Sequence, residues 1–168
     1  MSDSVPDAVQ PTQYLTFHLA DEQYGVDILA VREIRGWTPV TRIPQAPSFV
    51  LGVLNLRGVV VPVLDLRTRF SLPALEPGAQ TVTVIVAVNG SLFGVVVDAV
   101  SDVVDVAAKD LLPVPGMGVA VDTEYLRGLV TQGDRMVLLL DVDKLLHPQD
   151  LEMLEAALPA AADELAVA

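Results

Sequence analysis

The sequence contains no cysteine, so it can form no disulfide framework and carry out no chemistry that needs a thiol. It has only two histidines, His18 and His147, and neither stands three or four positions from another histidine, as the ligands of a helical metal site do. No glycine-rich segment ends in the Gly-Lys-Ser/Thr of a phosphate loop, and no serine lies in a nucleophile elbow. We therefore expect a protein that is not an enzyme and needs no cofactor or metal.

Basic residues are also scarce. Ten lysines and arginines stand against 22 acidic residues, which gives a net charge of −12, and the only lysines are Lys109 and Lys144. Proteins that bind nucleic acid do so largely through clustered lysine and arginine side chains, whereas the arginines here are scattered. We therefore expect no nucleic-acid partner, and we interpret the negative charge as a source of solubility for a chain that is 52% hydrophobic.

Long hydrophobic runs are missing as well, although the mean hydropathy of +0.50 is high. No run approaches the roughly 18 apolar residues that a membrane-spanning helix needs. The strongest runs, residues 82–88 and 136–140, have the length and aliphatic character of buried strands. No charged start followed by an apolar segment marks a signal peptide. These features predict a cytoplasmic, strand-rich protein without direct membrane insertion.

The chain contains an internal repeat of about 70 residues. Three pairs of segments match in register: Tyr24-Gly25-Val26 with Phe93-Gly94-Val95, Val31-Arg32-Glu33-Ile34 with Val100-Ser101-Asp102-Val103, and Leu56-Arg57-Gly58 with Leu126-Arg127-Gly128. The first two pairs are 69 positions apart and the third is 70 apart. Each copy then ends in an aliphatic run that is closed by an aspartate, Asp65 or Asp141. The sequence therefore predicts two homologous units.

Short apolar segments separated by turn residues predict about five strands in each copy. The resulting organisation is a disordered tail over residues 1–13, barrel one over about 14–79, barrel two over about 80–147, and a C-terminal helix over 148–168. This division leaves open whether the N-terminal strand pairs with barrel two. The fold class is mainly β, with two small antiparallel barrels packed together and a C-terminal α-helix.

The two closing aspartates admit two interpretations. A pair of carboxylates could perform acid–base catalysis, but Asp65 and Asp141 belong to different copies and have no histidine or metal beside them. Aspartate is a preferred first residue of a helical turn, where its carboxylate accepts a backbone N–H. We therefore expect both to cap the short helical turns that follow them.

Four segments resemble the CheW family of chemotaxis coupling proteins: "YGVDILAVREIRG" (24–36), "VTRIPQAPSFVLGVLNLRGVVVPVLDLR" (40–67), "FGVVVDAVSDV" (93–103) and "TEYLRGLVTQGDRMVLLLDVDKLL" (123–146). The block "NLRG…VPVLDLR" is highly specific for CheW-like domains, and the resemblance extends from about Tyr14 to the C-terminus. It implies that the barrels are SH3-like and five-stranded.

The resemblance also implies partners: the hairpin tip of a chemoreceptor's cytoplasmic domain, the regulatory domain of a CheA-type histidine kinase, and, as an open possibility, further CheW copies in rings. The residues that match the family's receptor-contacting positions are Val31, Glu33, Gly52, Asn55, Leu56, Arg57, Gly58 and Val100. Met117 matches a position used for contact with the kinase or with another copy.

The function implied is that of a chemotaxis adaptor, held by receptor arrays at the inner face of the membrane, that regulates kinase activity. Two alternatives remain open from the sequence. The first is a coupling protein of a different kinase array, such as one that controls surface motility. The second belongs to another class, a small-ligand sensor that uses the groove between the barrels as a pocket.

Overall fold

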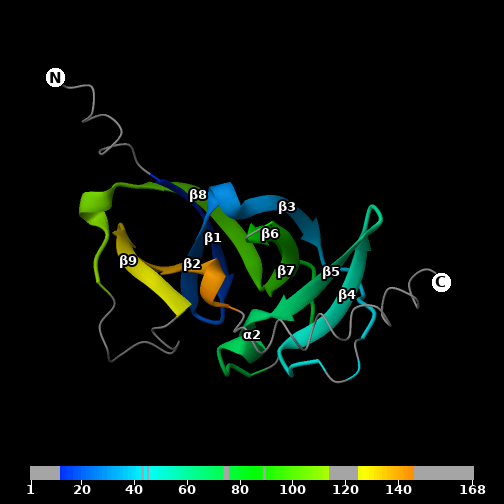
Figure 1. Ribbon diagram of the computed structural model, residues 1–168. Coiled ribbons are helices and arrows are strands. Elements are labelled where there is room, and N and C mark those ends of the chain that lie inside the picture. Colours follow the sequence, from blue (N-terminus) through cyan, green and yellow to red (C-terminus); the bar gives the residue numbers. More distant parts are fainter. Residues whose placement is uncertain are drawn as a thin grey trace.

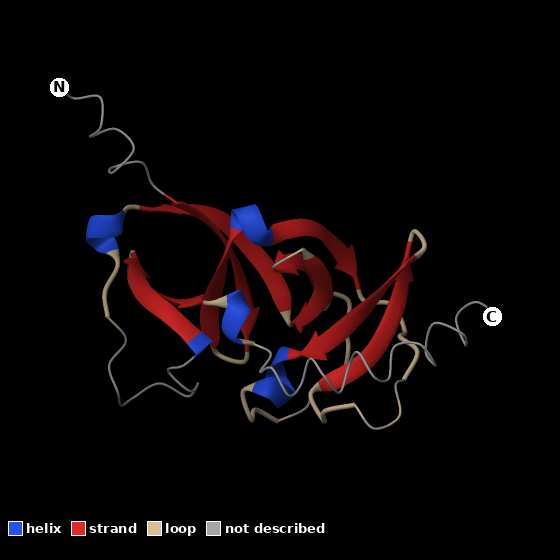
Figure 2. Ribbon diagram, in the orientation of Figure 1, coloured by secondary structure: helices blue, strands red, loops and turns tan. Residues whose placement is uncertain are grey.

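The computed structural model describes residues 12–42, 44, 46–73, 76–88, 90–113 and 125–145, and strands dominate it (Figures 1 and 2). The expected C-terminal helix over 148–168 lies outside the described residues, as does most of the expected N-terminal tail. The first strand already begins at Thr12, within the range assigned to that tail.

Ten strands form two five-stranded sheets, which confirms the mainly-β fold. Sheet A has the order β8-β1-β2-β10-β9, and sheet B has the order β3-β6-β7-β5-β4. The strands are β1 (Thr12–Leu19), β2 (Glu22–Asp27), β3 (Val31–Gly36), β4 (Val50–Leu56), β5 (Val59–Asp65), β6 (Val82–Val88), β7 (Ser91–Val97), β8 (Ala99–Val106), β9 (Leu126–Gln132) and β10 (Arg135–Leu140). Short helical turns are η1 (Ile28–Ala30), α2 (Leu66–Arg69), η2 (Ala108–Asp110) and η4 (Val142–Lys144).

Each sheet curls until the segment that follows one end strand meets the other end strand (Figure 2). In sheet B, Thr41 follows β3 and forms an isolated bridge with Val53 of β4. In sheet A, Leu112 follows β8 and forms the same kind of bridge with Leu129 of β9. Among the described residues, these single bridges take the place of a full ladder between the end strands.

The sheets do not follow the predicted division into consecutive barrels 14–79 and 80–147. Sheet B consists of five strands that are consecutive in the sequence, β3 to β7, from Val31 to Val97. Sheet A combines β1 and β2 with β8, β9 and β10. Within the described residues, the chain crosses between the sheets twice, through η1 and through Asp98. The cause is strand pairing: β1 pairs with β8, and β2 pairs in parallel with β10. The pattern of apolar residues predicts where strands occur, but it does not predict which strands pair with each other.

The internal repeat is real, and its two copies exchange strands. Strands β1 to β5 correspond in order to β6 to β10, because the two sheet orders match position by position. The first two strands of each copy complete the sheet that holds the last three strands of the other copy. Gly25 of β2 pairs with Leu139 of β10, and their equivalents, Gly94 and Val63, pair in the same way in sheet B.

One predicted match within the repeat is wrong. Leu56-Arg57-Gly58 was aligned with residues 126–128, but Arg57 and Gly58 form the turn between β4 and β5, whereas Arg127 lies near the start of β9. The structural equivalent of that turn is Gly133-Asp134, between β9 and β10. The interval between equivalent residues of the two copies grows from 69 to 76 positions along the chain, mainly because the loop before β9 is longer than the loop before β4.

Both closing aspartates cap helical turns, as predicted. Asp65 Oδ1 accepts the N–H of Arg67 at 3.1 Å, and Asp141 Oδ1 accepts the N–H of Asp143 at 3.2 Å. Asp65 is the final residue of β5, and Asp141 directly follows β10. The caps therefore turn the chain out of β5 into α2 and out of β10 into η4.

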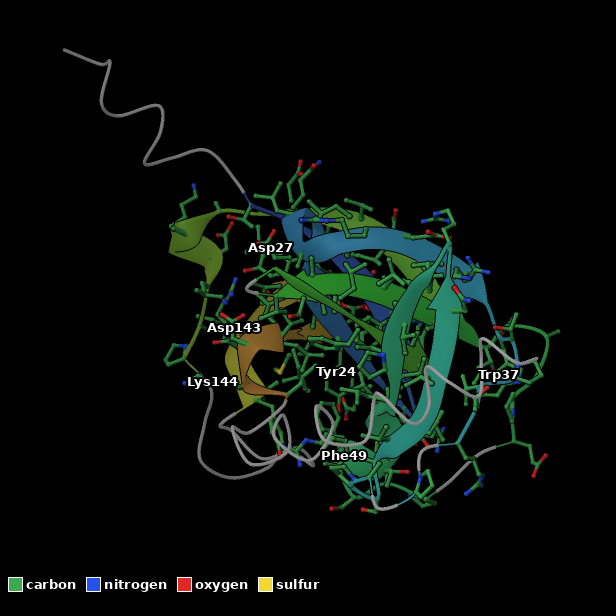
Figure 3. All side chains as sticks on the ribbon, turned by 45° about the vertical axis from the view of Figure 1, so that its right-hand side comes forward. Tyr24, Asp27, Trp37, Phe49, Asp143 and Lys144 are labelled. Atoms are coloured by element: carbon green, nitrogen blue, oxygen red, sulfur yellow. The ribbon has the colours of Figure 1, made fainter. Side chains whose placement is uncertain are left out.

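The two sheets share one hydrophobic core at their junction. It contains buried side chains from both sheets and includes an aromatic chain that runs Phe17–Tyr24–Phe70–Tyr125, with ring centroids 6.0, 5.7 and 5.4 Å apart. Tyr24 lies at the centre of the molecule (Figure 3). Its burial, and secondarily the charge of Glu22, raise the pKa of Tyr24 to about 12, so its hydroxyl remains neutral.

Arg69 of α2 joins the halves at this junction. Its guanidinium lies over the rings of Phe49 and Tyr125, at 4.3 and 4.8 Å from their centroids, and its Nε donates to the Leu145 carbonyl at 2.7 Å. Phe49 and Tyr125 are equivalent residues of the two copies, since their carbonyls accept the N–H groups of Asp65 and Asp141 respectively. Arg69 therefore contacts the same position in both repeats.

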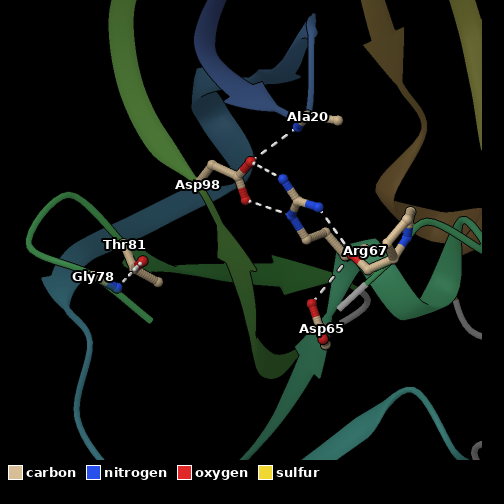
Figure 4. Close-up of polar contacts among 7 residues, drawn as sticks. Ala20, Asp65, Arg67, Gly78, Thr81 and Asp98 are labelled. Atoms are coloured by element: carbon tan, nitrogen blue, oxygen red, sulfur yellow. Dashed lines mark hydrogen bonds and ion pairs between the residues drawn. The ribbon is translucent and has the colours of Figure 1, made fainter. Parts of the chain in front are cut away.

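Asp98 forms a second link, at one crossing between the sheets (Figure 4). Its Oδ1 accepts Arg67 Nε at 2.9 Å, and its Oδ2 accepts Arg67 Nη2 at 2.7 Å and the backbone N–H of Ala20 at 2.9 Å. Arg67 lies in α2, whereas Ala20 lies in the turn between β1 and β2. Burial alone would raise the pKa of Asp98, but the hydrogen bonds from Arg67 and Ala20 and the charge of Arg67 lower it below 3.8.

Arg67→Met should lower the free energy of unfolding by about 2 kcal/mol at pH 7, because it leaves a partly buried carboxylate without its cation. A depressed pKa stabilises the fold above the unfolded-state value of about 3.9, and this contribution is lost as the pH falls through the lower folded value. Urea unfolding should therefore show the difference from wild type shrinking between pH 5 and pH 2. Arg32→Met, at an exposed arginine, is the control. A difference in the free energy of unfolding that does not change with pH would contradict this account of Asp98.

Candidate functional site

The tip of the β4–β5 hairpin projects from sheet B, at the right of Figure 1. Leu56 pairs with Val59, so the turn has two residues, Arg57 and Gly58, with φ angles of 52° and 88°. A two-residue hairpin of this type needs positive φ at both positions. Asn55 fixes the turn further, since its Oδ1 accepts the N–H of Gly58 at 2.7 Å.

The side chain of Arg57 reaches back to β3. Alternate residues of this strand, Val31, Glu33 and Arg35, are partly buried. Glu33 Oε1 accepts Arg57 Nη2 at 2.7 Å, and Glu33 Oε2 accepts Arg35 Nη1 at 2.9 Å. We call these three residues, Glu33, Arg35 and Arg57, the Glu33–arginine cluster. The cluster ties the hairpin tip to the end strand of the same sheet.

The cluster is electropositive within an acidic protein. Two guanidinium groups share one carboxylate, although the whole chain carries a net charge of −12. The hydrogen bond from Arg57 is the largest influence on Glu33 and lowers its pKa; the weaker opposing effect of burial raises it, and Arg35 lowers it further. Glu33 therefore remains ionised at neutral pH. Arg57 is the outermost member, with 72% of its side chain exposed.

The structure brings together four of the residues that the family resemblance assigns to receptor contact: Glu33, Asn55, Arg57 and Gly58. Val31 lies two residues before Glu33 on the same strand and packs on the shared core.

Val100 lies in the other sheet. It pairs with Phe17 on β8 and packs, partly buried, on the shared core. Among the described residues, no hydrogen bond or ion pair joins Val100 to the cluster.

Gly52 and Leu56 belong to the same predicted set, but the structure gives them a packing role. Leu56 is 4% exposed and lies in a core cluster inside sheet B. Gly52 is buried, and a Cβ there would lie 2.2 Å from the carbonyl oxygen of Thr41. Glycine is therefore needed for the bridge between Thr41 and Val53, which brings the chain after β3 against β4. Packing inside sheet B therefore accounts for both residues, without contact between either of them and a partner.

Arg35 is a member of the cluster that the sequence interpretation missed. Its signal was available, because Glu33 and Arg35 are two apart in a predicted strand and must share a face. Met117, the predicted kinase-contact residue, lies outside the described residues.

The structure offers little support for a small-ligand pocket between the sheets. A pocket of about 440 Å³ is lined by Trp37, Arg42, Arg67, Glu76 and Asp98, among others. Its most buried charges, Arg67 and Asp98, are paired with each other, and Asp65 bonds to α2. Arg67, Asp98 and Asp65 therefore have little capacity left to bind a ligand, and Arg42 and Glu76 are the other charged side chains of the lining.

Within the described ranges, no helix has both the length and the apolar character to cross a membrane. The described residues also contain no group of three or more histidine or acidic side chains placed to hold a metal ion.

Comparison with known proteins gives a consistent result. A sequence model of the CheW-like domain matches residues 13–150. The chemotaxis protein CheW of Klebsiella aerogenes is 43% identical over 85% of this chain and 86% of its own length. The protein FrzA of Myxococcus xanthus is 34% identical over 80% of this chain and 85% of its own. The crystal structure of the scaffolding protein TtCheW from Thermoanaerobacter tengcongensis superposes with a TM-score of 0.77 at 31% identity, covering 83% of this chain and 90% of that one.

Gly52→Ala should lower the free energy of unfolding by about 2 kcal/mol or more, because the new methyl group overlaps the Thr41 carbonyl and must break the bridge to β4. Gly36→Ala is the matched control, since a Cβ there meets no atom within 4 Å, and we expect a change of less than about 1 kcal/mol. Urea unfolding followed by circular dichroism measures both. Equal stability of the two variants would show that Gly52 is not needed for packing.

Proposed function

The chain belongs to the CheW-like domain family, and from this premise we propose that it is an adaptor that couples chemoreceptors to a CheA-type histidine kinase and thereby regulates kinase activity. The proposal is one of assembly and not of catalysis, in agreement with the scaffolding role named for the solved relative. We place the protein in receptor arrays at the inner face of the membrane, held there by its partners.

The array we propose is a chemotaxis array. The relative of 43% identity is a chemotaxis protein, as is a second CheW, from Rhizobium meliloti, at 38% identity, whereas FrzA is less similar at 34%. A coupling protein of another kinase array, for example one for surface motility, is the second candidate, supported by that weaker similarity alone.

The observation that carries the receptor assignment is the conformation of Arg57. A non-glycine residue at positive φ costs about 1 kcal/mol, and the residues that usually accept this conformation are glycine, asparagine and aspartate. The equivalent turn in sheet A has glycine at the same position, Gly133, with φ 63°. An arginine at this position, with its side chain 72% exposed, is best explained by binding to a partner.

The surface that we assign to the receptor therefore comprises the hairpin tip and the Glu33–arginine cluster. Exposed charged groups at such a surface contribute mainly to specificity and to the rate of encounter. The kinase and further copies of the chain are assigned to a separate surface that includes Met117. Two separate surfaces allow simultaneous binding, so each single contact can be weak while the array is stable.

Arg57→Glu should reduce binding to a receptor cytoplasmic fragment at least tenfold, because it replaces the outermost positive charge by a carboxylate that faces Glu33. Kinase binding should be unchanged, and stability should change by less than about 1 kcal/mol because the side chain is exposed. Arg135→Glu makes the same charge change beside the equivalent turn of sheet A and serves as the control. Calorimetric titration with receptor and kinase fragments measures both. Unchanged receptor affinity in Arg57→Glu would refute this surface.

Met117→Arg should weaken kinase binding or self-association while sparing receptor binding, because it puts a charge on a contact that the family resemblance assigns to a large apolar residue. The measurement is the same pair of titrations, with analytical ultracentrifugation of the protein alone. Loss of both kinase and receptor binding in a folded variant would contradict the separation of the two surfaces.

A further inference from the structure

We propose that the Glu33–arginine cluster is a carboxylate-binding site, in which Arg35 offsets the charge of Glu33 so that the full positive charge of Arg57 is available to an aspartate or glutamate side chain of the partner. Only the identity of that partner, the chemoreceptor, rests on the proposed function. The chemistry of the site follows from the contacts within the cluster.

The hydrogen-bonding capacity of Arg57 is largely unused. Its guanidinium has five N–H groups, and within the described residues it donates one hydrogen bond, from Nη2 to Glu33 Oε1 at 2.7 Å. With 72% of the side chain exposed and a single hydrogen bond from Nη2, the planar group has N–H groups left for a partner. An arginine can donate two parallel hydrogen bonds to a carboxylate. The bond from Nη2 to Glu33 restricts the orientation in which Arg57 would do so.

Arg35 is suited to a different role. It is 33% exposed, lies two residues after Glu33 on the same face of β3, and donates from Nη1 to Glu33 Oε2 at 2.9 Å. Its Nε is buried and has no hydrogen-bond partner in the described part of the chain. Arg35 is therefore a positioning residue: it fixes Glu33 and neutralises it, and its side chain is less than half as exposed as that of Arg57.

The charges show why Arg35 matters. With Arg35 the cluster has a net charge of +1, and a carboxylate from the partner brings it to zero. Without Arg35, Glu33 would cancel the charge of Arg57, and an incoming carboxylate would meet a neutral pair in a protein of net charge −12. Interactions between charges a few ångströms apart near a protein surface are strong enough to decide the affinity for such a group.

The other half of the molecule supports this assignment. Under the repeat, Glu33 corresponds to Asp102, Arg35 to Val104, and Arg57 to Gly133. Sheet A thus keeps an acidic residue at the first position but has neither arginine, and Asp102 instead accepts the N–H of Val103 at 2.7 Å. The carboxylate site is therefore present in sheet B alone among the two sheets, although both have the same strand order.

The test compares Arg35→Gln with Arg32→Gln. Both variants remove one positive charge from β3, but Arg32 lies on the opposite, exposed face, and its Nη1 bonds to the Leu29 carbonyl. The first readout is the affinity for a receptor cytoplasmic fragment at 50 mM and 500 mM salt. The second needs no receptor: the NMR signal of the Arg57 Nε–H is followed as potassium acetate replaces potassium chloride at constant ionic strength.

We expect Arg35→Gln to weaken receptor binding about fivefold at 50 mM salt and less at 500 mM, because salt screens the lost charge. Arg32→Gln should remain within about twofold of wild type, and Arg35→Lys should restore most of the affinity because it restores the charge. Acetate should shift the Arg57 signal in wild type and in Arg32→Gln, and markedly less in Arg35→Gln.

The two readouts separate the possible failures. Equal receptor affinity in Arg35→Gln and Arg32→Gln, with wild-type binding intact, would overturn the role of Arg35 and leave the proposed function standing. A wild-type protein that binds no receptor but shows the acetate shift, with its loss in Arg35→Gln, would overturn the proposed function and support the carboxylate site. An acetate response that is the same in all variants would overturn the site itself.

Discussion

Neither copy of the internal repeat can complete a sheet by itself. Each copy supplies two strands to one sheet and three to the other, and the two strands from one copy fill the gap within the three from its counterpart: β1 and β2 lie between β8 and β10, and β6 and β7 lie between β3 and β5. The junction is reinforced by Arg69, which lies between the equivalent rings Phe49 and Tyr125, and by Asp98, which ties α2 to the β1–β2 turn. The two sheets therefore depend on each other for folding, and the surfaces they carry are held in one fixed relation.

On this shared frame the two copies have diverged at the positions that face outward. Sheet B has Arg57 in its hairpin turn and two charged partners on β3, whereas sheet A has Gly133 in that turn and no arginine at the matching positions of β8. Near the start of the strand before each turn, β9 in sheet A and β4 in sheet B, it is sheet A that carries the arginine. Arg127 of sheet A reaches toward Tyr14 and two aspartates, while the equivalent residue of sheet B is Leu51. The duplication thus provides two similar supports with different surfaces, as the proposed binding of two partners requires.

Much of this architecture could be predicted from the sequence, because it depends on local patterns. The repeat, the strands and the aspartate caps follow from apolar runs, turn residues and capping preferences, which act over a few residues. The exchange of strands could not be predicted, since it depends on which edges meet. The alignment of Arg57 with Arg127 was wrong for a related reason: three matching letters at nearly the right interval do not reveal a longer loop between them. At the site, the family motif led to Glu33 and Arg57, but it could not separate Gly52 and Leu56, which serve packing, from residues with exposed groups. Arg35 was missed although its spacing from Glu33 indicated a shared face.

The central claim is that this protein makes kinase activity depend on receptor state by binding both partners at once. The most direct test is kinase autophosphorylation in a reconstituted mixture of receptor cytoplasmic fragments, a CheA-type kinase and this protein, with co-sedimentation of the three. The account predicts a ternary complex in which kinase activity rises only when all three components are present. Kinase that binds this protein but shows the same activity with and without receptor would contradict the coupling role.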